Sequence, residues 1–340
     1  MLVVVTVVLV PRVVVRSLGE LLAGATERAS FVASDSKSGA GLEWVVVGGH
    51  RCVLKHVHPD DDWSMRFFGA TSCVPLEVWR SGLMDVAPDH IVHGMIGAAG
   101  GVGREGLGAA LLMEDASDVL IPPGDEQLSV ETHLALIDGM AALAARMWGW
   151  TDTVGLIPLA SRWRGFGDAD LAMEERAGWP NAVPRIAKQG WEQFRLRSPA
   201  DVLEIVEALR ANAAPLVAAV ARTPLTFVHG DWKLGNLGVD AAGRTVLLDW
   251  TLCGAGPVCS DLGWYLAINA ARLPRAKEHV IDDLRAALGR YGIDTDGWWD
   301  RQLSLCLLGT LVLLGWEKAL GNEDEFGWWC ERARFGAPFL

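Results

Sequence analysis

The sequence predicts an α+β protein in two lobes, a small antiparallel β-sheet followed by a larger, mostly helical part. Three observations predict this order. Short β-rich segments separated by glycine turns fill the start of the chain, apolar residues recur at helical spacing from residue 129, and residues 278–340 are mostly helical. We place the boundary near residues 113–116, so that residues 1–115 form the first lobe and residues 116–340 the second.

Composition and charge exclude several classes of protein. The chain has 340 residues and 51% of them are hydrophobic, which is enough to bury a large core and is incompatible with general disorder. Its 30 Lys and Arg stand against 42 Asp and Glu, so the net charge is −12. A nucleic-acid partner is not expected, because binding phosphates needs a basic surface. An acidic protein of this kind can instead bind a cationic ligand.

The cysteines and the two most apolar stretches bear on location. Six cysteines are scattered without a C-x-x-C pair, which predicts reduced thiols in the cytoplasm. Residues 2–10 are almost all Val and Leu, but basic residues follow them, the reverse of a signal peptide. We expect a strand there, with a targeting segment as the alternative. Residues 303–316 are shorter than the ~20 residues that span a membrane and predict a buried helix. No membrane partner is expected, and no oligomeric state is indicated.

The first lobe is predicted to be an antiparallel meander followed by a helix. Gly48-Gly49 marks a tight turn between two β-rich segments, and Pro75 suits the first turn of a helix. Residues 17–27 predict a short helix with Ser17 as its N-cap. The run Pro59-Asp60-Asp61-Asp62 is typical of a solvated loop. The predicted strands are residues 29–33, 42–47, 52–57 and 110–115, and the predicted helix lies near residues 74–84.

The second lobe is predicted to begin with a helix that Ser129 caps. Residues 151–200 have no clear periodicity and predict irregular structure. Residues 201–222 predict one helix, with Asp201 or Ser198 as its N-cap. A β-hairpin is expected after this helix.

One stretch combines residues that suit phosphoryl chemistry. It reads His229-Gly230-Asp231-Trp232-Lys233-Leu234-Gly235-Asn236, and Asp249 follows the predicted hairpin. Because the hairpin folds back, we expect Asp249 to lie beside Asn236, and two hard oxygen ligands of this kind suit Mg²⁺ bound to polyphosphate. Asp231 is then free to accept a proton from an attacking hydroxyl.

This pattern resembles the catalytic loop of protein kinases, H-R-D-x-x-x-x-N, with Gly230 in place of the arginine. It is most similar to the aminoglycoside phosphotransferase and choline kinase branch of the protein kinase-like superfamily. The resemblance covers roughly residues 30–320 and is specific at 227–265. It implies the two-lobed protein kinase-like fold. The downstream residues that agree with this branch are Asp249-Trp250, Gly254, Gly256-Pro257 and Asp261-Leu262.

The resemblance also implies a role for each matching residue. Asp261 is expected to fix the catalytic loop through hydrogen bonds to its backbone. Lys233 has the position at which protein-serine kinases carry a lysine, whereas many relatives have histidine there. The matched positions are a structural histidine at His229, the catalytic base at Asp231, a lysine near the transferring phosphate at Lys233, the Mg²⁺ ligands at Asn236 and Asp249, and the loop-fixing aspartate at Asp261.

A lysine of the first lobe is the expected contact to the nucleotide. V-L-K at residues 53–55 resembles the strand that carries this lysine in the superfamily, where it meets the α and β phosphates of ATP or GTP. Lys55 is therefore assigned to the nucleotide site. Its acidic partner should lie on a helix, and Glu77 is the best candidate.

Two further segments are expected at the nucleotide. The loop S-D-S-K-S-G-A-G at residues 34–41 includes Ser38 and Gly39, and its backbone N–H groups can cradle phosphate, with an ordinary hairpin loop as the alternative. The segment from Met113 to Asp115 should form the hinge between the lobes, with backbone groups that meet the adenine edge.

The resemblance implies an enzyme that moves the γ-phosphate of ATP to a hydroxyl of a small molecule. The acceptor is expected over the catalytic loop, and it can be cationic, because the lobe is acidic and 13 of the 16 Trp follow residue 115. A choline- or sugar-kinase-like metabolic enzyme and a nucleotide-binding pseudokinase are the alternatives. Candidate contacts to the acceptor are Glu317, Glu323-Asp324-Glu325, Trp264, Trp298, Trp299, Trp316, Trp328 and Trp329.

Overall fold

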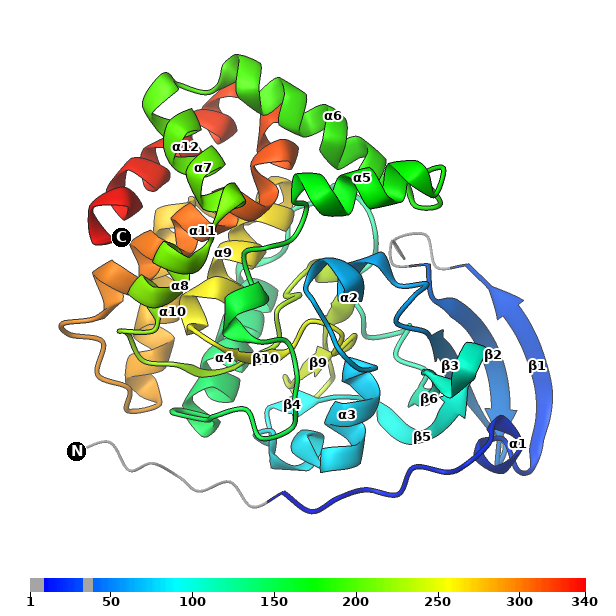
Figure 1. Cartoon of the computed structure of the whole chain (residues 1–340). Helices are drawn as coiled ribbons and strands as arrows, with labels where there is room; N and C mark the ends of the chain where they lie inside the picture. Colours follow the sequence, from blue (N-terminus) through cyan, green and yellow to red (C-terminus); the bar gives the residue numbers. More distant parts are fainter. Residues whose placement is uncertain (1–8, 33–38) are drawn as a thin grey trace.

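A five-stranded antiparallel sheet and a group of helices lie on two sides of the molecule (Figure 1). The computed structural model describes residues 9–32 and 39–340. The sheet has the strand order β1-β2-β3-β6-β5, which combines an N-terminal meander with a later hairpin. Its strands are β1 (Ala25–Phe31), β2 (Gly41–Val47), β3 (His50–Val57), β5 (Met95–Val102) and β6 (Gly108–Glu114).

The central strand β3 places alternate residues on opposite faces of the sheet. Cys52 and Leu54 belong to a small apolar core that the short helix α1 (Leu18–Leu21) covers. Val53 and Lys55 point to the other face, toward the helices, and Lys55 lies between Leu42 of β2 and Leu111 of β6 in register. The predicted β2–β3 turn at Gly48-Gly49 is confirmed, since both glycines have positive φ.

Two helices connect β3 to β5. The helix α2 (Trp63–Phe67) begins at its N-cap Asp62, and α3 (Val74–Ser81) begins with Pro75 in its first turn, as predicted. A two-residue strand, β4 (Ile91–Val92), then pairs in parallel with β9 (Thr245–Leu247) of the second part. This pairing joins the two parts of the molecule beside the segment that precedes Asp249.

The second part is built around the long apolar helix α11 (Trp299–Leu320), against which α6, α7, α8, α9 and α12 pack. By length and composition α11 could cross a membrane, but most of it is buried inside the protein, as the sequence predicted for residues 303–316. The other helices are α4 (Val130–Arg146), α5 (Asp168–Arg176), α6 (Ala182–Arg197), α7 (Ala200–Ala211), α8 (Ala214–Val220), α9 (Val258–Ile268), α10 (Lys277–Arg290) and α12 (Glu323–Gly336).

Short strands frame the segment from His229 to Asp249. The strand β7 (Thr226–Val228) pairs with β10 (Gly254–Gly256), and β8 (Leu237–Val239) forms a hairpin with β9. The predicted hairpin is therefore confirmed for β8 and β9. The strand before the loop, however, pairs with residues that follow Asp249, so both ends of the segment are tied together.

Two predictions for the helical part are wrong. Residues 151–200 are not irregular throughout, because α5 and α6 form there. The predicted helix at 201–222 is two helices, since the Asn212 side chain accepts a hydrogen bond from the N–H of Ala214 and a proline occupies the first turn of α8. Pro199, not Asp201 or Ser198, is the N-cap of α7.

Candidate active site

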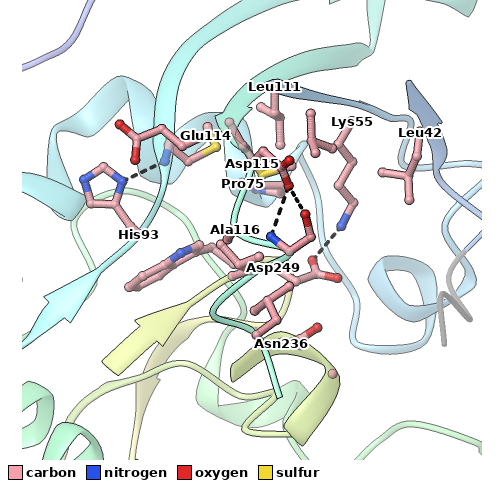
Figure 2. Close-up of a pocket in the computed structure, with 18 of the residues that line it drawn as sticks. Leu42, Lys55, Pro75, His93, Leu111, Glu114, Asp115, Ala116, Asn236 and Asp249 are labelled. Carbon is pink, nitrogen blue, oxygen red and sulfur yellow. Dashed lines mark hydrogen bonds and ion pairs between the residues drawn. The ribbon is translucent and has the colours of Figure 1, made fainter. Parts of the chain in front are cut away.

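A cavity of about 280 Å³ lies between the sheet and the segment that contains β8 and β9 (Figure 2). Most of its wall is apolar, and one end carries charged and amide side chains. The apolar lining includes Phe31, Leu42, Trp44, Val53, Met84, Met95, Leu111, Met113, Leu120, Leu248 and Trp250, and the polar end is formed by Lys55, Lys233, Asn236 and Asp249.

Lys55 and Asp249 form an ion pair across this cavity, with 2.8 Å between Nζ and Oδ1 (Figure 2). Burial raises the pKa of the Asp249 carboxyl, but the charges of Lys55 and Lys233 outweigh it, so the pKa lies well below its usual range. Asp249 is therefore ionised at neutral pH. Its φ is 63°, a strained backbone conformation for a residue other than glycine, and such strain is characteristic of functional sites.

Asp231 lies at the inner end of the loop with both carboxylate oxygens engaged. Asn236 Nδ2 donates to Oδ2 at 2.8 Å and to the Asp231 carbonyl at 3.1 Å, and Lys233 Nζ is 3.8 Å from Oδ2. Burial raises the pKa of the Asp231 carboxyl, against the lowering effects of Lys233 and the hydrogen bonds. This carboxylate is thus closer to accepting a proton than Asp249 is.

The role of Trp264 at the candidate base was not predicted from the sequence. Its indole Nε1 donates a hydrogen bond of 2.9 Å to Asp231 Oδ1, and its partly exposed ring lies edge-on to Phe68. One signal was available: Trp264 is three residues after Asp261 on α9, and residues at this spacing share a face of a helix. The face that holds the loop backbone therefore also reaches the base.

Helix α9 holds the loop from its first turn to its C-cap. Asp261 accepts hydrogen bonds from the backbone N–H groups of His229 at 2.9 Å and Gly230 at 2.8 Å, which confirms the expectation for this residue. Asn269, the C-cap of α9, accepts from the N–H of Leu234 and donates to the carbonyl of Trp232. The loop is therefore fixed at both ends by one helix.

Gly230 is required by geometry at the position where protein kinases have arginine. Its φ is 82°, and a Cβ at this position would lie 2.2 Å from the carbonyl oxygen of Leu252. His229 beside it is fully buried, and its Nδ1 accepts the N–H of Asp231 at 3.3 Å. Burial lowers the pKa of His229, so the ring is neutral, in agreement with a structural role.

The sequence signature of the phosphotransferase enzyme family matches residues 126–298, just over half of the chain, including the loop and Asp249. The chain belongs to this family. It is therefore a phosphotransferase that acts on the hydroxyl groups of small molecules. No curated protein sequence matches it significantly.

Solved structures share the two-lobed kinase-like fold of this phosphotransferase. A microcompartment-associated aminopropanol kinase has a TM-score of 0.55 and 13% identity, over 91% of this chain and 90% of that one. Choline kinase from Streptococcus pneumoniae has a TM-score of 0.51 and 12% identity, over 95% and 96% of the two chains. A thermostable mutant of an aminoglycoside phosphotransferase has a TM-score of 0.47 and 15% identity, over 94% and 97%. At these identities the likeness to the first two structures shows the fold alone.

The side chains at the polar end of the phosphotransferase cavity fit a magnesium ion that is bound partly by the protein and partly by a phosphate-containing substrate. Asp249 is ionised, and the Asn236 amide, whose Nδ2 donates to Asp231, has its oxygen Oδ1 as the atom that can bind a cation. Residues 9–32 and 39–340 contain no group of three or more His, Cys, Asp or Glu side chains arranged to enclose a metal. This donor set matches Mg²⁺, which proteins bind through one or two side chains while phosphate oxygens and water complete the octahedron.

Two of the predicted nucleotide contacts, Glu77 and Gly39, do not line the cavity. Glu77 pairs with Arg80, 2.6 Å away and three residues on, instead of with Lys55, so this pairing is a correction. The reason is helical geometry: Pro75 lines the cavity, and a residue two positions later points to the opposite side. Ser38 lies outside the described residues. Gly39 is not in the cavity wall; it lies beside Asn181, a residue of the segment that connects α5 to α6.

The predicted hinge does lie at the cavity. Met113, at the end of β6, lines the apolar wall together with Asp115. The Asp115 carboxylate accepts hydrogen bonds from the backbone N–H of Ser117 at 3.0 Å and from Arg51 Nε at 2.5 Å. The turn after β6 is therefore held by the Asp115 side chain, and Ala116 and Ser117 of this turn line the cavity.

The candidate acceptor contacts differ in the partners that the structure gives them. Trp264 touches the base, as described above. Two residues of the acidic run form ion pairs within the helical part: Glu323 pairs with Arg197, and Glu325 pairs with Lys277 and Lys318. The tryptophans at 298, 299, 316, 328 and 329 pack against other aromatic side chains of the helical part.

Proposed function

We propose that this phosphotransferase binds ATP, or GTP, with Mg²⁺ in the cavity and transfers the γ-phosphate to a hydroxyl of a small, cationic acceptor. One observation carries the proposal. Lys55, Asn236 and Asp249 converge at the polar end of the cavity, and Asp231, hydrogen-bonded to Asn236, lies next to them. Phosphoryl transfer requires charge neutralisation and positioning at one place, and these are the groups that supply them.

The apolar part of the cavity accounts for the base of the nucleotide. Phe31 stacks on Trp44 with 4.3 Å between ring centroids, and Leu111 and Met113 of β6 line the cavity from the same face of the sheet, on the far side of β3. A flat heterocycle fits such an apolar slot, with the backbone after Met113 available to its polar edge. Lys55 then lies at the phosphate end, where its amine can bind the α and β phosphates.

Asn236 and Asp249 are assigned to the metal. A bound Mg²⁺ supplies charge that stabilises the phosphate oxygens as the bond to the leaving group breaks. The amide of Asn236 suits a double task, because Nδ2 donates to Asp231 while Oδ1, the acceptor atom of the amide, can bind the metal. The side chain of Asn236 can therefore bind the metal and orient the base Asp231 at the same time.

Asp231 is assigned to the acceptor hydroxyl. The hydroxyl oxygen forms the new bond to the γ-phosphorus, the bond between that phosphorus and the β,γ-bridging oxygen breaks, and the nucleoside diphosphate leaves. Asp231 takes the hydroxyl proton, and its raised pKa favours this transfer more than a fully solvated aspartate would. Lys233 lines the cavity next to Asp231, where its positive charge can stabilise the γ-phosphate during the transfer.

Two features support a cationic acceptor. The net charge of −12 favours the approach of cations, and a partly exposed indole stands beside the base. Two solved structures with TM-scores above 0.5 act, by their names, on aminopropanol and choline, which are amino alcohols. An amino alcohol is therefore the first acceptor class to test, with aminoglycosides and sugars after it and a pseudokinase as the alternative without turnover.

The test is a panel of acceptors with ATP labelled in the γ-phosphate, with products identified by mass spectrometry. The expected result is an acceptor-dependent, Mg²⁺-dependent phosphate ester of one amino alcohol or aminoglycoside. If the product is a phosphorylated neutral sugar, the proposed transfer reaction stands but the proposed cationic acceptor is wrong. Nucleotide binding without turnover across the panel would favour the pseudokinase, and the absence of nucleotide binding would reject the proposal.

We extend the proposal to organisation and location. Residues 1–115 and 116–340 are proposed to act as two lobes that meet at residues 113–116. All six cysteines are free and buried, which supports a reducing compartment such as the cytoplasm.

A further inference from the structure

Asp249 accepts a hydrogen bond from a threonine that lies two residues further along the chain. Thr251 Oγ1 donates to Asp249 Oδ1 at 2.5 Å, and Lys55 Nζ is 2.8 Å from the same oxygen (Figure 2). Thr251 is 4% exposed, so water competes little for its hydroxyl. A hydrogen bond from a hydroxyl to an ionised carboxylate is short, and it is stronger than a bond between neutral groups. The carboxylate is therefore held firmly by a neutral side chain.

The local backbone brings these two side chains together. Asp249 has a φ of 63°, in the left-handed region, and the chain turns directly after it. Aspartate tolerates this conformation better than most residues, because its short side chain forms local hydrogen bonds. Trp250 anchors the turn in the core: its indole Nε1 donates to the carbonyl of Leu247, and its ring packs edge-on against His229. The position of Thr251 is therefore set by an anchored turn.

Lys55 and Thr251 hold the Asp249 carboxylate in different ways. The proposed function assigns the Lys55 amine to the α and β phosphates, and its charge repels a metal ion at the same carboxylate. The Thr251 hydroxyl is neutral and belongs to the same turn as Asp249, so it can stay on Oδ1 when Lys55 turns to a nucleotide. Mg²⁺ demands near-ideal octahedral geometry, and groups that hydrogen-bond a ligating carboxylate set its orientation.

We propose that Thr251 is a positioning residue for the metal, whose hydroxyl orients the Asp249 carboxylate toward Mg²⁺ bound to the nucleotide. The inference rests on the proposed function, which assigns Asp249 to the metal. Thr251 is not one of the residues that line the cavity, so it acts through Asp249. Loss of the hydroxyl should therefore weaken the binding of a nucleotide with Mg²⁺. Binding of the nucleotide without Mg²⁺ depends on Lys55 and the apolar wall and should be unaffected.

The test measures the dissociation constant of ADP by calorimetry, once with Mg²⁺ and once with a chelator in place of the metal. Thr251→Val keeps the β-branched shape and removes the hydroxyl, whereas Thr251→Ser keeps the hydroxyl. In Thr251→Val the dissociation constant of MgADP is expected to rise about tenfold, and that of metal-free ADP to stay within about twofold of the wild type. In Thr251→Ser the dissociation constant of MgADP should stay within about threefold of the wild type.

Thr310→Val is the matched control, because Thr310 is also buried and its hydroxyl donates to the Cys306 carbonyl within α11. This variant should bind ADP like the wild type under both conditions. If Thr251→Val does not fold, Thr251→Ala takes its place, since it differs from Thr251→Ser by the hydroxyl alone.

Two results would overturn the inference alone. One is MgADP binding at the wild-type level in the folded variant without the hydroxyl. The other is an equal weakening of ADP binding with and without Mg²⁺, which would indicate a merely structural role for Thr251. A wild type that binds no ADP, or that binds it equally well with and without Mg²⁺, overturns the proposed function together with the inference.

Discussion

At the scale of single residues, the two loop carboxylates differ in the charges and donors around them. Asp249 faces Lys55 and Lys233 and is ionised, whereas Asp231 is buried among hydrogen-bond donors and has a raised pKa. Environments that separate two carboxylates in this way assign them different roles. The sequence motif predicted both positions, but Trp264 was named only as a possible acceptor contact, because its hydrogen bond to Asp231 depends on how α9 packs against the loop.

The hydrogen bond from Trp264 is expected to tune the base. Trp264→Phe keeps the ring and removes the N–H donor, so the pKa of Asp231 should rise further. Catalysis needs the ionised form of Asp231. The acidic limb of the profile of kcat/KM against pH should therefore move to higher pH, and at pH values below this limb kcat/KM should be roughly tenfold lower than in the wild type.

The matched control is Trp316→Phe, because in the described part of the chain the indole nitrogen of Trp316 has no acceptor. Its pH profile should coincide with that of the wild type. An unshifted limb in Trp264→Phe would show that the indole does not act on Asp231.

Gly230 is expected to be irreplaceable for steric reasons. Gly230→Ala puts a Cβ 2.2 Å from the Leu252 carbonyl at a φ of 82° and should cost about 3 kcal/mol or more in the free energy of unfolding, measured with urea. Gly243→Ala is the control, because Gly243 has a φ of 78° with nothing within 4 Å of the added Cβ, and it should cost only about 1 kcal/mol. Equal losses would contradict the steric account.

At the scale of elements, helix α9 holds the catalytic loop through Asp261 and Asn269, and α2 is joined to α5 of the helical part by an ion pair. The strands β2, β3 and β6, the helix α3 and the β8–β9 hairpin were predicted from glycine turns, Pro75 and β-rich segments, whereas α2 was not predicted and β1 begins inside the predicted helix at 17–27. The helix α5 was not predicted because its apolar period is weak. The helix α6 was missed although its buried residues Ala187, Trp191 and Phe194 recur at helical spacing. The break between α7 and α8 was missed although Asn212 and Pro215 mark it.

The ion pair between Arg66 of α2 and Glu174 of α5 is expected to hold these two helices together. Glu174 is 2% exposed, so Arg66→Ala leaves its charge buried and should destabilise the protein by about 3 kcal/mol. Arg104→Ala removes an exposed pair with Asp61 and should cost below about 1 kcal/mol in the same urea titration. A loss for Arg66→Ala no larger than for Arg104→Ala would refute the structural role of the buried pair.

At the scale of the whole molecule, the site lies where the sheet, the β8–β9 hairpin and α9 meet. The sheet contributes Lys55 and the apolar walls, and the hairpin and α9 fix the carboxylates. The excess of tryptophan in the helical part is mostly core, with Trp264 as the member that touches the base. Composition thus indicated the character of that part, and only the fold could identify which tryptophan matters.

The most direct test of the central claim compares the wild type with Asp231→Asn in transfer of the γ-phosphate to the acceptor found by the panel. The account predicts that Asp231→Asn lowers kcat by at least about a hundredfold while MgADP binds with a dissociation constant within about threefold of the wild type. Transfer at the wild-type rate in Asp231→Asn would contradict the assignment of this cavity and its loop as the site of phosphoryl transfer.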